Sequence, residues 1–308
     1  MCRDPEVVLL FSTMVERLGP EMASGIPTIF GKLGVCTLEM IGADFANYPD
    51  HRMNYFLLIS NIVQRCFQSL FMLGPDNFKV VVNSILWAIK HQSPKVAEIG
   101  LNTLAELIRN INSNQELINQ FYALFLMPIC GDIFLVLTDS LHKSGFKQQA
   151  EILRQVIFII ESNQLTVPID QSCPDNKTYI RNYLISALVA NFPNMSKTNV
   201  TVFIDAMFAN CTSRLPFKTA VRDFLITMKE FAEDSELLYS EERQVHSHQQ
   251  YLETRRGSKK VGGDEKAGDD FEGPTRAEVV NSLLGHLLSG SIFIAINGIV
   301  NILVHTLI

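Results

Sequence analysis

The stretch that decides the fold class is FKTAVRDFLITMKEF, residues 217–231. Its apolar residues recur at intervals of three and four, which places their side chains along one stripe of an α-helix. They are Phe217, Ala220, Val221, Phe224, Leu225, Met228 and Phe231. We expect the Phe217/Val221/Phe224/Met228 stripe to lie buried between neighbouring helices.

The same helical period runs through the first 240 residues. Residues 78–89 repeat the apolar stripe, and charged residues mark the opposite, wet face of residues 95–109. Asp4-Pro5 and Ser93-Pro94 are typical helix starts, because a short polar side chain caps the free N–H groups and proline fits the first turn. The predicted helices cover 5–18, 25–43, 50–73, 76–91, 94–111, 114–141 with a break at Pro128, 145–162, 176–191, 197–210, 215–232 and 235–253.

These helices are joined by short connections and recur as pairs about every 40 residues. That spacing matches the HEAT repeat and is longer than the tetratricopeptide period. In a stack of helical hairpins each helix contacts its partner and both neighbouring repeats, which explains the wide apolar faces. The sequence therefore predicts an all-α HEAT-repeat solenoid of antiparallel helix pairs without a sheet, followed by a disordered or loosely attached C-terminal tail.

Composition excludes several classes of protein. The chain has 308 residues, of which 47% are hydrophobic and 19% are charged, and its formal net charge is −6. Such a chain buries a large core, so it is neither a disordered protein nor a small disulfide scaffold. Binding to duplex nucleic acid requires a basic surface, so we expect no direct duplex partner.

Six cysteines are scattered along the chain without metal-ligand spacing. They are Cys2, Cys36, Cys66, Cys130, Cys173 and Cys211. The N-terminus shows no signal-peptide pattern, so we interpret the cysteines as buried, reduced thiols and place the protein in the cytosol or the nucleus.

No motif for catalysis or cofactor binding is present: the sequence contains no HExxH, GxSxG, phosphate loop or GxGxxG. His51, His91 and His142 fall at predicted helix ends, where we expect them to be exposed or to cap a helix. Cys130 reads as a packed thiol.

Asp132 and Asp139 would act as an acid–base pair only if the fold brought them together, and we interpret them as part of a solvated helix face. We interpret Trp87 as a packing residue at the edge of the core. We therefore predict a non-catalytic protein with no catalytic, cofactor-binding or metal site and no cofactor, whose helical surface binds or supports partners.

Several long segments, in order along the chain, carry a family resemblance. They are PDHRMNYFLLI (49–59), FKVVVNSILWAIKH (78–91), VAEIGL (96–101), VRDFL (221–225) and EER (241–243). They resemble the C-terminal HEAT repeats of the exportin-1 family, karyopherin-β receptors for leucine-rich nuclear export signals. The resemblance covers residues 3–245.

The resemblance implies a receptor segment that works with the GTP-bound GTPase Ran and with export cargo. In that family the N-terminal repeats bind Ran and the central repeats carry the cargo groove, and both precede the region matched here. The resemblance therefore assigns no cargo-binding residue to this sequence, and the partner-binding residues stay unknown. The resemblance also leaves open whether this segment carries a secondary surface that faces Ran, because C-terminal repeats of the family close the ring around Ran.

The sequence divides into three parts. Residues 1–245 are the exportin-1-like repeats, residues 246–276 a charged, glycine-containing linker, and residues 277–308 an apolar tail. The basic residues within 255–260 also fit a nuclear import signal, but we favour a charged linker.

The tail has no charged side chain from Val279 to Ile308. A non-native or disordered extension, a membrane anchor through 283–308, and a docked helix or a hairpin turning at Asn297-Gly298 all stay open. Asn297 and Asn301 lie one helical turn apart, and each amide would cost about 1–3 kcal/mol if left unsatisfied in lipid. We therefore predict that the tail does not form a stable membrane span.

The leading functional hypothesis is the C-terminal segment of a nuclear export receptor, without its cargo groove and main Ran site. The alternative is a stand-alone HEAT scaffold tethered to a membrane by its tail.

Overall fold

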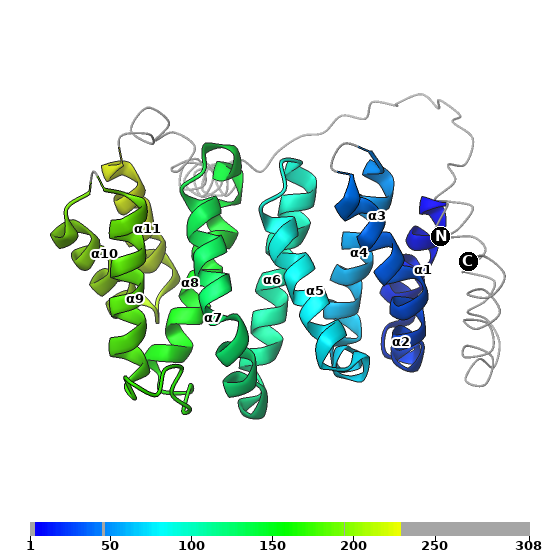
Figure 1. Ribbon diagram of the computed structural model, residues 1–308, viewed down its shortest axis with the longest axis horizontal. Coiled ribbons are helices and arrows are strands. Elements are labelled where there is room, and N and C mark those ends of the chain that lie inside the picture. The colour runs from blue at the N-terminus through cyan, green and yellow to red at the C-terminus, as the bar shows by residue number, and fades with distance from the viewer. Residues whose placement is uncertain (1–3, 45–46, 194, 229–308) are drawn as a thin grey trace, which may run out of the picture. The chain divides into compact units, whose positions relative to one another are not determined.

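The computed structural model describes residues 4–44, 47–193 and 195–228, all of which belong to one compact unit. Its helices follow one another in chain order (Figure 1). They are α1 (Pro5–Leu18), α2 (Ile26–Ile29), α3 (Val35–Ala43), α4 (Pro49–Arg65), α5 (Pro75–Ile89), α6 (Pro94–Asn112), α7 (Gln115–Leu137), α8 (Phe146–Glu161), α9 (Asn176–Asn191), α10 (Lys197–Asn210) and α11 (Arg214–Thr227).

Short 3₁₀ and π segments connect some of these helices. They are η1 (Gly19–Gly25), the π turn η2 (Phe30–Gly34), η3 (Phe67–Leu73) and η4 (Ser140–Gly145). The described residues contain no strand, and Asp170 and Cys173 form an isolated bridge.

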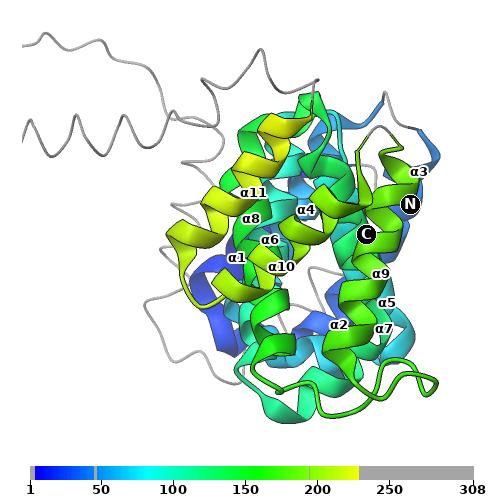
Figure 2. The same cartoon turned by 90° about the vertical axis from the view of Figure 1, so that its left-hand side faces the viewer.

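The helices form two layers. In one layer α1 contacts α4, α4 contacts α6, α6 contacts α8, and α8 contacts α11, while α5 contacts α7 in the other. Viewed from the α9–α11 end, α6, α8 and α11 lie on one side and α5, α7 and α9 on the other (Figure 2). The prediction of an all-α HEAT-type solenoid is confirmed.

The apolar stripes read from the sequence form the core. On α6, Val96, Leu104 and Leu107 are buried, whereas Lys95 and Glu98 are exposed. Gly100 brings α6 against α5, because a Cβ atom at this position would lie 2.8 Å from the Cβ of Ala88. The helix pair is therefore held at a distance that requires glycine.

The prediction of one continuous helix over 50–73 is wrong, because the chain bends sharply at Cys66. α4 ends at Arg65, and η3 leaves it at an angle of 111°. Cys66 occupies the bend with φ −132° and ψ 35°, and its buried thiol donates to the carbonyl of Gly19 at 2.9 Å. The turn lets Phe67 and Phe71 pack edge to face and places Phe71 on Phe78.

The predicted break at Pro128 is also wrong, because α7 passes through it without interruption. Proline removes one N–H and displaces the carbonyl four residues earlier, which belongs to Leu124. Pro128 and Leu124 both lie on the exposed side of α7, where water can satisfy the carbonyl. The helix ends instead at Leu137, and 140–145 forms η4.

The predicted helix over 215–232 is confirmed as α11 up to Thr227. Phe217, Val221 and Phe224 are buried as expected. Met228 is buried too, but its backbone is extended (φ −81°, ψ 125°), so it lies beyond the helix end.

Asparagine side chains link successive repeats in one layer. Nδ2 of Asn54 donates to the carbonyl of Pro5 at 2.9 Å, Nδ2 of Asn61 to Ser12 at 3.1 Å, and Nδ2 of Asn110 to Val63 at 3.1 Å. Each bond spans 47 or 49 residues, so it joins a helix to its counterpart one repeat earlier.

Two described stretches are long and apolar enough to cross a membrane by length and composition alone: Pro5–Ala43 and Gln115–Leu137. The first is divided among α1, α2 and α3 with 3₁₀ and π segments between them, and the second, α7, packs against α5, α6 and α8. Several predictions concern residues outside the described ranges. They are the helix over 235–253, the domain boundary at 245, the linker over 246–276 and the tail over 277–308.

Candidate functional site

An apolar groove lies between α5 and α7. Its floor is an aromatic cluster in which Phe71 stacks on Phe78 with ring centroids 5.5 Å apart, and Phe78 meets Phe125 edge to face at 6.2 Å. The groove encloses about 280 Å³. Its lining residues are Phe71, Gly74, Pro75, Phe78, Lys79, Ile111, Leu117, Gln120, Phe121, Leu124 and Phe125.

A second groove, of about 250 Å³, lies between α7 and α9 and is lined mainly by apolar side chains such as Phe134, Leu184 and Leu188. Leu124 and Leu135 on α7 are 54% and 58% exposed at the two grooves. Such surfaces accept aliphatic or aromatic side chains of a bound segment.

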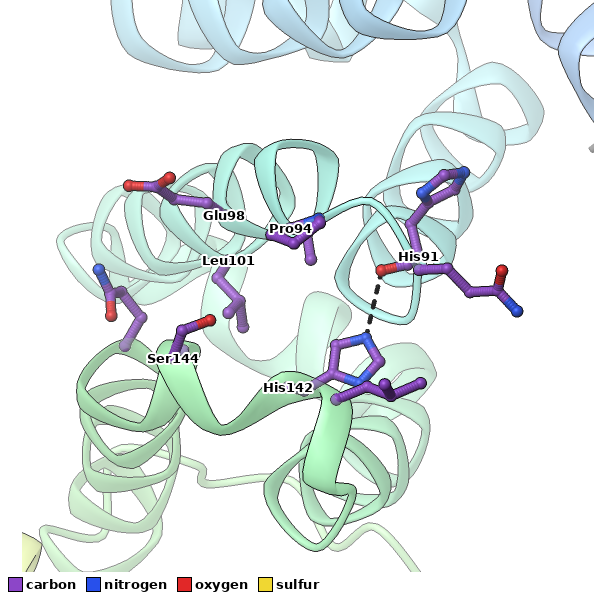
Figure 3. A pocket seen from close by; sticks show the side chains of 11 residues that line it. His91, Pro94, Glu98, Leu101, His142 and Ser144 are labelled. Carbon is purple, nitrogen blue, oxygen red and sulfur yellow. Dashed lines mark hydrogen bonds between the residues drawn. The ribbon is translucent and has the colours of Figure 1, made fainter. Parts of the chain in front are cut away.

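A third cavity, of about 310 Å³, is more polar and lies where the α5–α6 link meets η4 and the start of α8. His142 and Ser144 face Glu98 and Leu101 across it (Figure 3). His91 contributes its backbone carbonyl, which accepts a hydrogen bond from Nε2 of His142 at 3.3 Å.

The three histidines singled out from the sequence are not exposed. The relative solvent exposure is 8% for His51, 7% for His91 and 8% for His142. They lie near helix ends as predicted, but all three side chains are buried. Burial lowers the pKa of His51, which nearby Asp4 and Asp50 partly offset.

The two candidate carboxylates have separate partners. Asp132 on α7 forms an ion pair with Lys90, whose Nζ lies 2.8 Å from Oδ1. Asp139 caps η4 by accepting from the backbone N–H of Leu141, and its other oxygen lies 2.8 Å from Nδ1 of His142. Neither carboxylate is a free acid or base, and Asp132 is partly buried rather than fully solvated.

Cys130 is confirmed as a packed thiol, since it is fully buried and burial raises its pKa to about 12. Cys66 and Cys211 are buried as well. The prediction of burial is wrong for Cys36 and Cys173, which are partly exposed, and all five of these thiols are free. Cys2 lies outside the described residues.

Trp87 is confirmed as a packing residue at the edge of the core. Its ring lies 5.5 Å from that of Phe56 and 5.7 Å from that of His91, measured between centroids. In the described ranges no group of three His, Cys, Asp or Glu side chains is placed to hold a metal ion.

Sequence reasoning missed the link between His142 and His91, which are 51 residues apart. The only available signal was that spacing, which resembles the 47–49 residues of the asparagine links. It also missed Arg52, a 3% exposed side chain whose Nη2 donates to the carbonyls of Ile41 and Asp44 and so closes the end of α3.

Comparisons with known proteins agree on one family. The family described as CRM1 C terminal matches residues 1–233. Exportin-1 of Schizosaccharomyces pombe is 40% identical over 248 residues, covering 79% of this chain and 23% of the relative. Protein EXPORTIN 1A of Arabidopsis thaliana is 39% identical, covering 78% and 23%. Exportin-1 of Drosophila melanogaster is 33% identical, covering 79% and 23%. The chain thus spans about a quarter of the length of these curated relatives.

Proposed function

The chain belongs to the exportin-1 (CRM1) family, and from this membership we propose that it is the C-terminal HEAT-repeat segment of a nuclear export receptor. The observation that carries the proposal is the family match over residues 1–233, which coincides with the stacked helices described to residue 228. A solenoid of this kind acts through its extended surface, because each repeat adds to one continuous face.

We propose further that the segment is non-catalytic and acts with Ran-GTP and protein cargo in a complete receptor that moves between nucleus and cytoplasm. The described surface supports a binding rather than a catalytic role through apolar grooves between α5 and α7 and between α7 and α9. Both candidate carboxylates have partners: Asp132 forms an ion pair with Lys90, and Oδ2 of Asp139 lies 2.8 Å from Nδ1 of His142. The cargo groove and the main Ran site belong to preceding repeats of such a receptor.

Fluorescence anisotropy with a labelled leucine-rich export peptide tests the placement of the groove. The chain alone should not bind the peptide, with or without Ran-GTP, whereas full-length S. pombe exportin-1 serves as the positive control. Saturable micromolar binding to the chain, competed by unlabelled peptide, would show that a groove lies within this sequence and would overturn the assignment.

Carbonate extraction of the full chain expressed in cells distinguishes the membrane-tethered scaffold from the receptor segment. We expect the chain in the supernatant, and we expect deletion of 277–308 to leave its thermal midpoint nearly unchanged. Retention in the membrane pellet that disappears on deletion of 277–308 would favour the alternative.

A further inference from the structure

The groove between α7 and α9 has no charged side chain among the described residues that line it. The other two cavities each include at least one, since Lys79 lines the groove between α5 and α7 and Glu98 lines the polar cavity. Burying a charge without a partner costs free energy. The α7–α9 groove therefore favours a bound segment that is itself uncharged.

This groove has a packed floor and an exposed rim. Phe134 of α7 is 7% exposed and meets Phe203 of α10 edge to face at 6.4 Å, so packing beneath it holds the floor in place. At the rim Leu135 and Tyr183 are 58% and 37% exposed. Nothing lies within 4 Å of a Cβ built on Gly131, which lines the same groove. The two helices thus leave apolar surface open to a further segment.

The sequence of this chain contains an uncharged segment with a matching pattern. Residues 279–308 include no Asp, Glu, Lys or Arg. Within them apolar residues recur at intervals of three and four, as on one stripe of an α-helix. They are Phe293, Ile296, Val300, Leu303 and Leu307. Asn297, Asn301 and His305 recur every four residues outside that stripe. An amphipathic pattern of this kind suits a groove, which covers one side of a helix, better than lipid, which surrounds it.

The groove and the segment also match in length. Along α9 the groove extends from Tyr183 to Phe192, which is about 14 Å at the helical rise of about 1.5 Å per residue. In a helix the apolar stripe from Phe293 to Leu303 would extend about 15 Å.

The segment can reach this groove from the end of the described residues. α11 packs against α10, and α10 packs against α9. Two helix spacings of about 8–10 Å each therefore separate α11 from α9. Residues 229–292 precede the segment, and a random chain of about 60 residues spans about 40 Å on average. Tethering also raises the effective concentration of the segment at the groove, so a modest intrinsic affinity suffices.

We propose that residues 293–307 of this chain dock as an amphipathic helix in the α7–α9 groove, with the apolar stripe against the groove and the amides toward water. Removal of both apolar surfaces from water supplies the driving force. An external apolar segment then has to displace the tail in order to bind there. The contact is local and opens before the stack unfolds, so deletion of 277–308 still leaves the thermal midpoint nearly unchanged.

Photocrosslinking in the full chain tests the docking. In Tyr183→p-benzoylphenylalanine the photoreactive ring replaces a rim residue of the α7–α9 groove. Phe71→p-benzoylphenylalanine is the matched control, because Phe71 is 38% exposed and lines the α5–α7 groove instead. Trypsin cleaves after Arg276 and finds no later site, so the tail is recovered as fragment 277–308. We expect this fragment to be linked to fragment 182–197, which contains the probe in the first variant.

Two substitutions in the tail, each combined with the probe at Tyr183, separate docking from chance contact. Val300→Asp should lower the crosslink yield by about tenfold or more, because docking would bury an unpaired carboxylate. Asn301→Asp adds the same charge on the polar side, so the yield should stay within about twofold.

Four outcomes would overturn the proposal. They are the absence of a link between 182–197 and 277–308, an equal yield from the Phe71 variant, an equal loss in the two tail variants, and a link found only in covalent dimers. The last result would mean that the groove holds the tail of a second copy.

Discussion

The ring of Phe224 on α11 stacks flat on the ring of Phe203 on α10, with centroids 3.8 Å apart and planes 8° from parallel. Both side chains are 5% exposed. Phe203 also meets Phe134 of α7 edge to face at 6.4 Å. The apolar stripe that predicts the fold class is thus joined through one aromatic stack to the helix layer opposite.

Phe224→Ala should lower the free energy of unfolding by about 3–5 kcal/mol, through lost transfer energy and the cavity left beside Phe203. Equilibrium urea denaturation of the full chain measures the loss. Val202→Ala is the control on α10, because Val202 is 63% exposed and surface changes stay within about 0.5 kcal/mol. A loss below about 1 kcal/mol for Phe224→Ala would mean that the stripe faces water.

Gly100→Ala should destabilise the chain by about 1–3 kcal/mol, because the added methyl group overpacks the contact between α5 and α6. Its Cβ would lie 2.8 Å from the Cβ of Ala88 and 2.9 Å from the backbone nitrogen of Ile89, which cannot yield without moving the helix.

Gly131→Ala is the matched control, since nothing lies within 4 Å of a Cβ at this position of α7. There alanine should be neutral or stabilise by up to about 1 kcal/mol. Equal effects of the two substitutions on the urea midpoint would contradict the close approach of α5 and α6.

His51 should make the chain less stable in acid. Its pKa is lowered in the folded state, mainly by burial, and returns to about 6.5 on unfolding. Below that value the unfolded chain binds more protons, so stability falls as the pH drops toward the folded-state pKa. Urea midpoints at pH 7.5 and 5.0 measure the fall, which should be smaller in His51→Gln. An unchanged fall in the variant would show that His51 is not the titrating group.

Thiol reactivity should follow burial. Burial raises the pKa of Cys130 to about 12. At pH 8 this thiol therefore holds roughly 1,000-fold less thiolate than an ordinary cysteine. Alkylation followed by peptide mass mapping should therefore label Cys36 and Cys173 first, and Cys130 only in denaturant. Labelling of Cys130 in the folded chain at the rate of Cys36 would contradict its packing.

Helix positions could be predicted because the apolar period and the proline starts are local signals. Pro49, Pro75 and Pro94 each begin a helix. The bend at Cys66 could not be predicted, because it depends on a thiol bond to Gly19, 47 residues away. The continuity of α7 through Pro128 could not be predicted for a related reason. Whether a proline breaks a helix depends on whether the carbonyl that it leaves without a donor lies on the side of the helix that faces water.

The buried histidines could not be placed for a similar reason. A histidine at a helix end is exposed or buried according to what the next repeat lays over it, and the sequence around His91 contains no sign of His142. Likewise the bonds of Arg52 to Ile41 and Asp44 are visible only once the end of α3 is in place.

The central claim, that this chain is the C-terminal segment of an export receptor, is tested most directly by a chimaera. The region of S. pombe exportin-1 that aligns with this chain is replaced by residues 1–233, and a reporter with a leucine-rich export signal is followed in cells that depend on the chimaera. A chimaera carrying Phe224→Asp, which buries an unpaired charge, is the control. The account predicts that the chimaera excludes the reporter from the nucleus and the control does not. Nuclear accumulation with a stable, folded chimaera would contradict it.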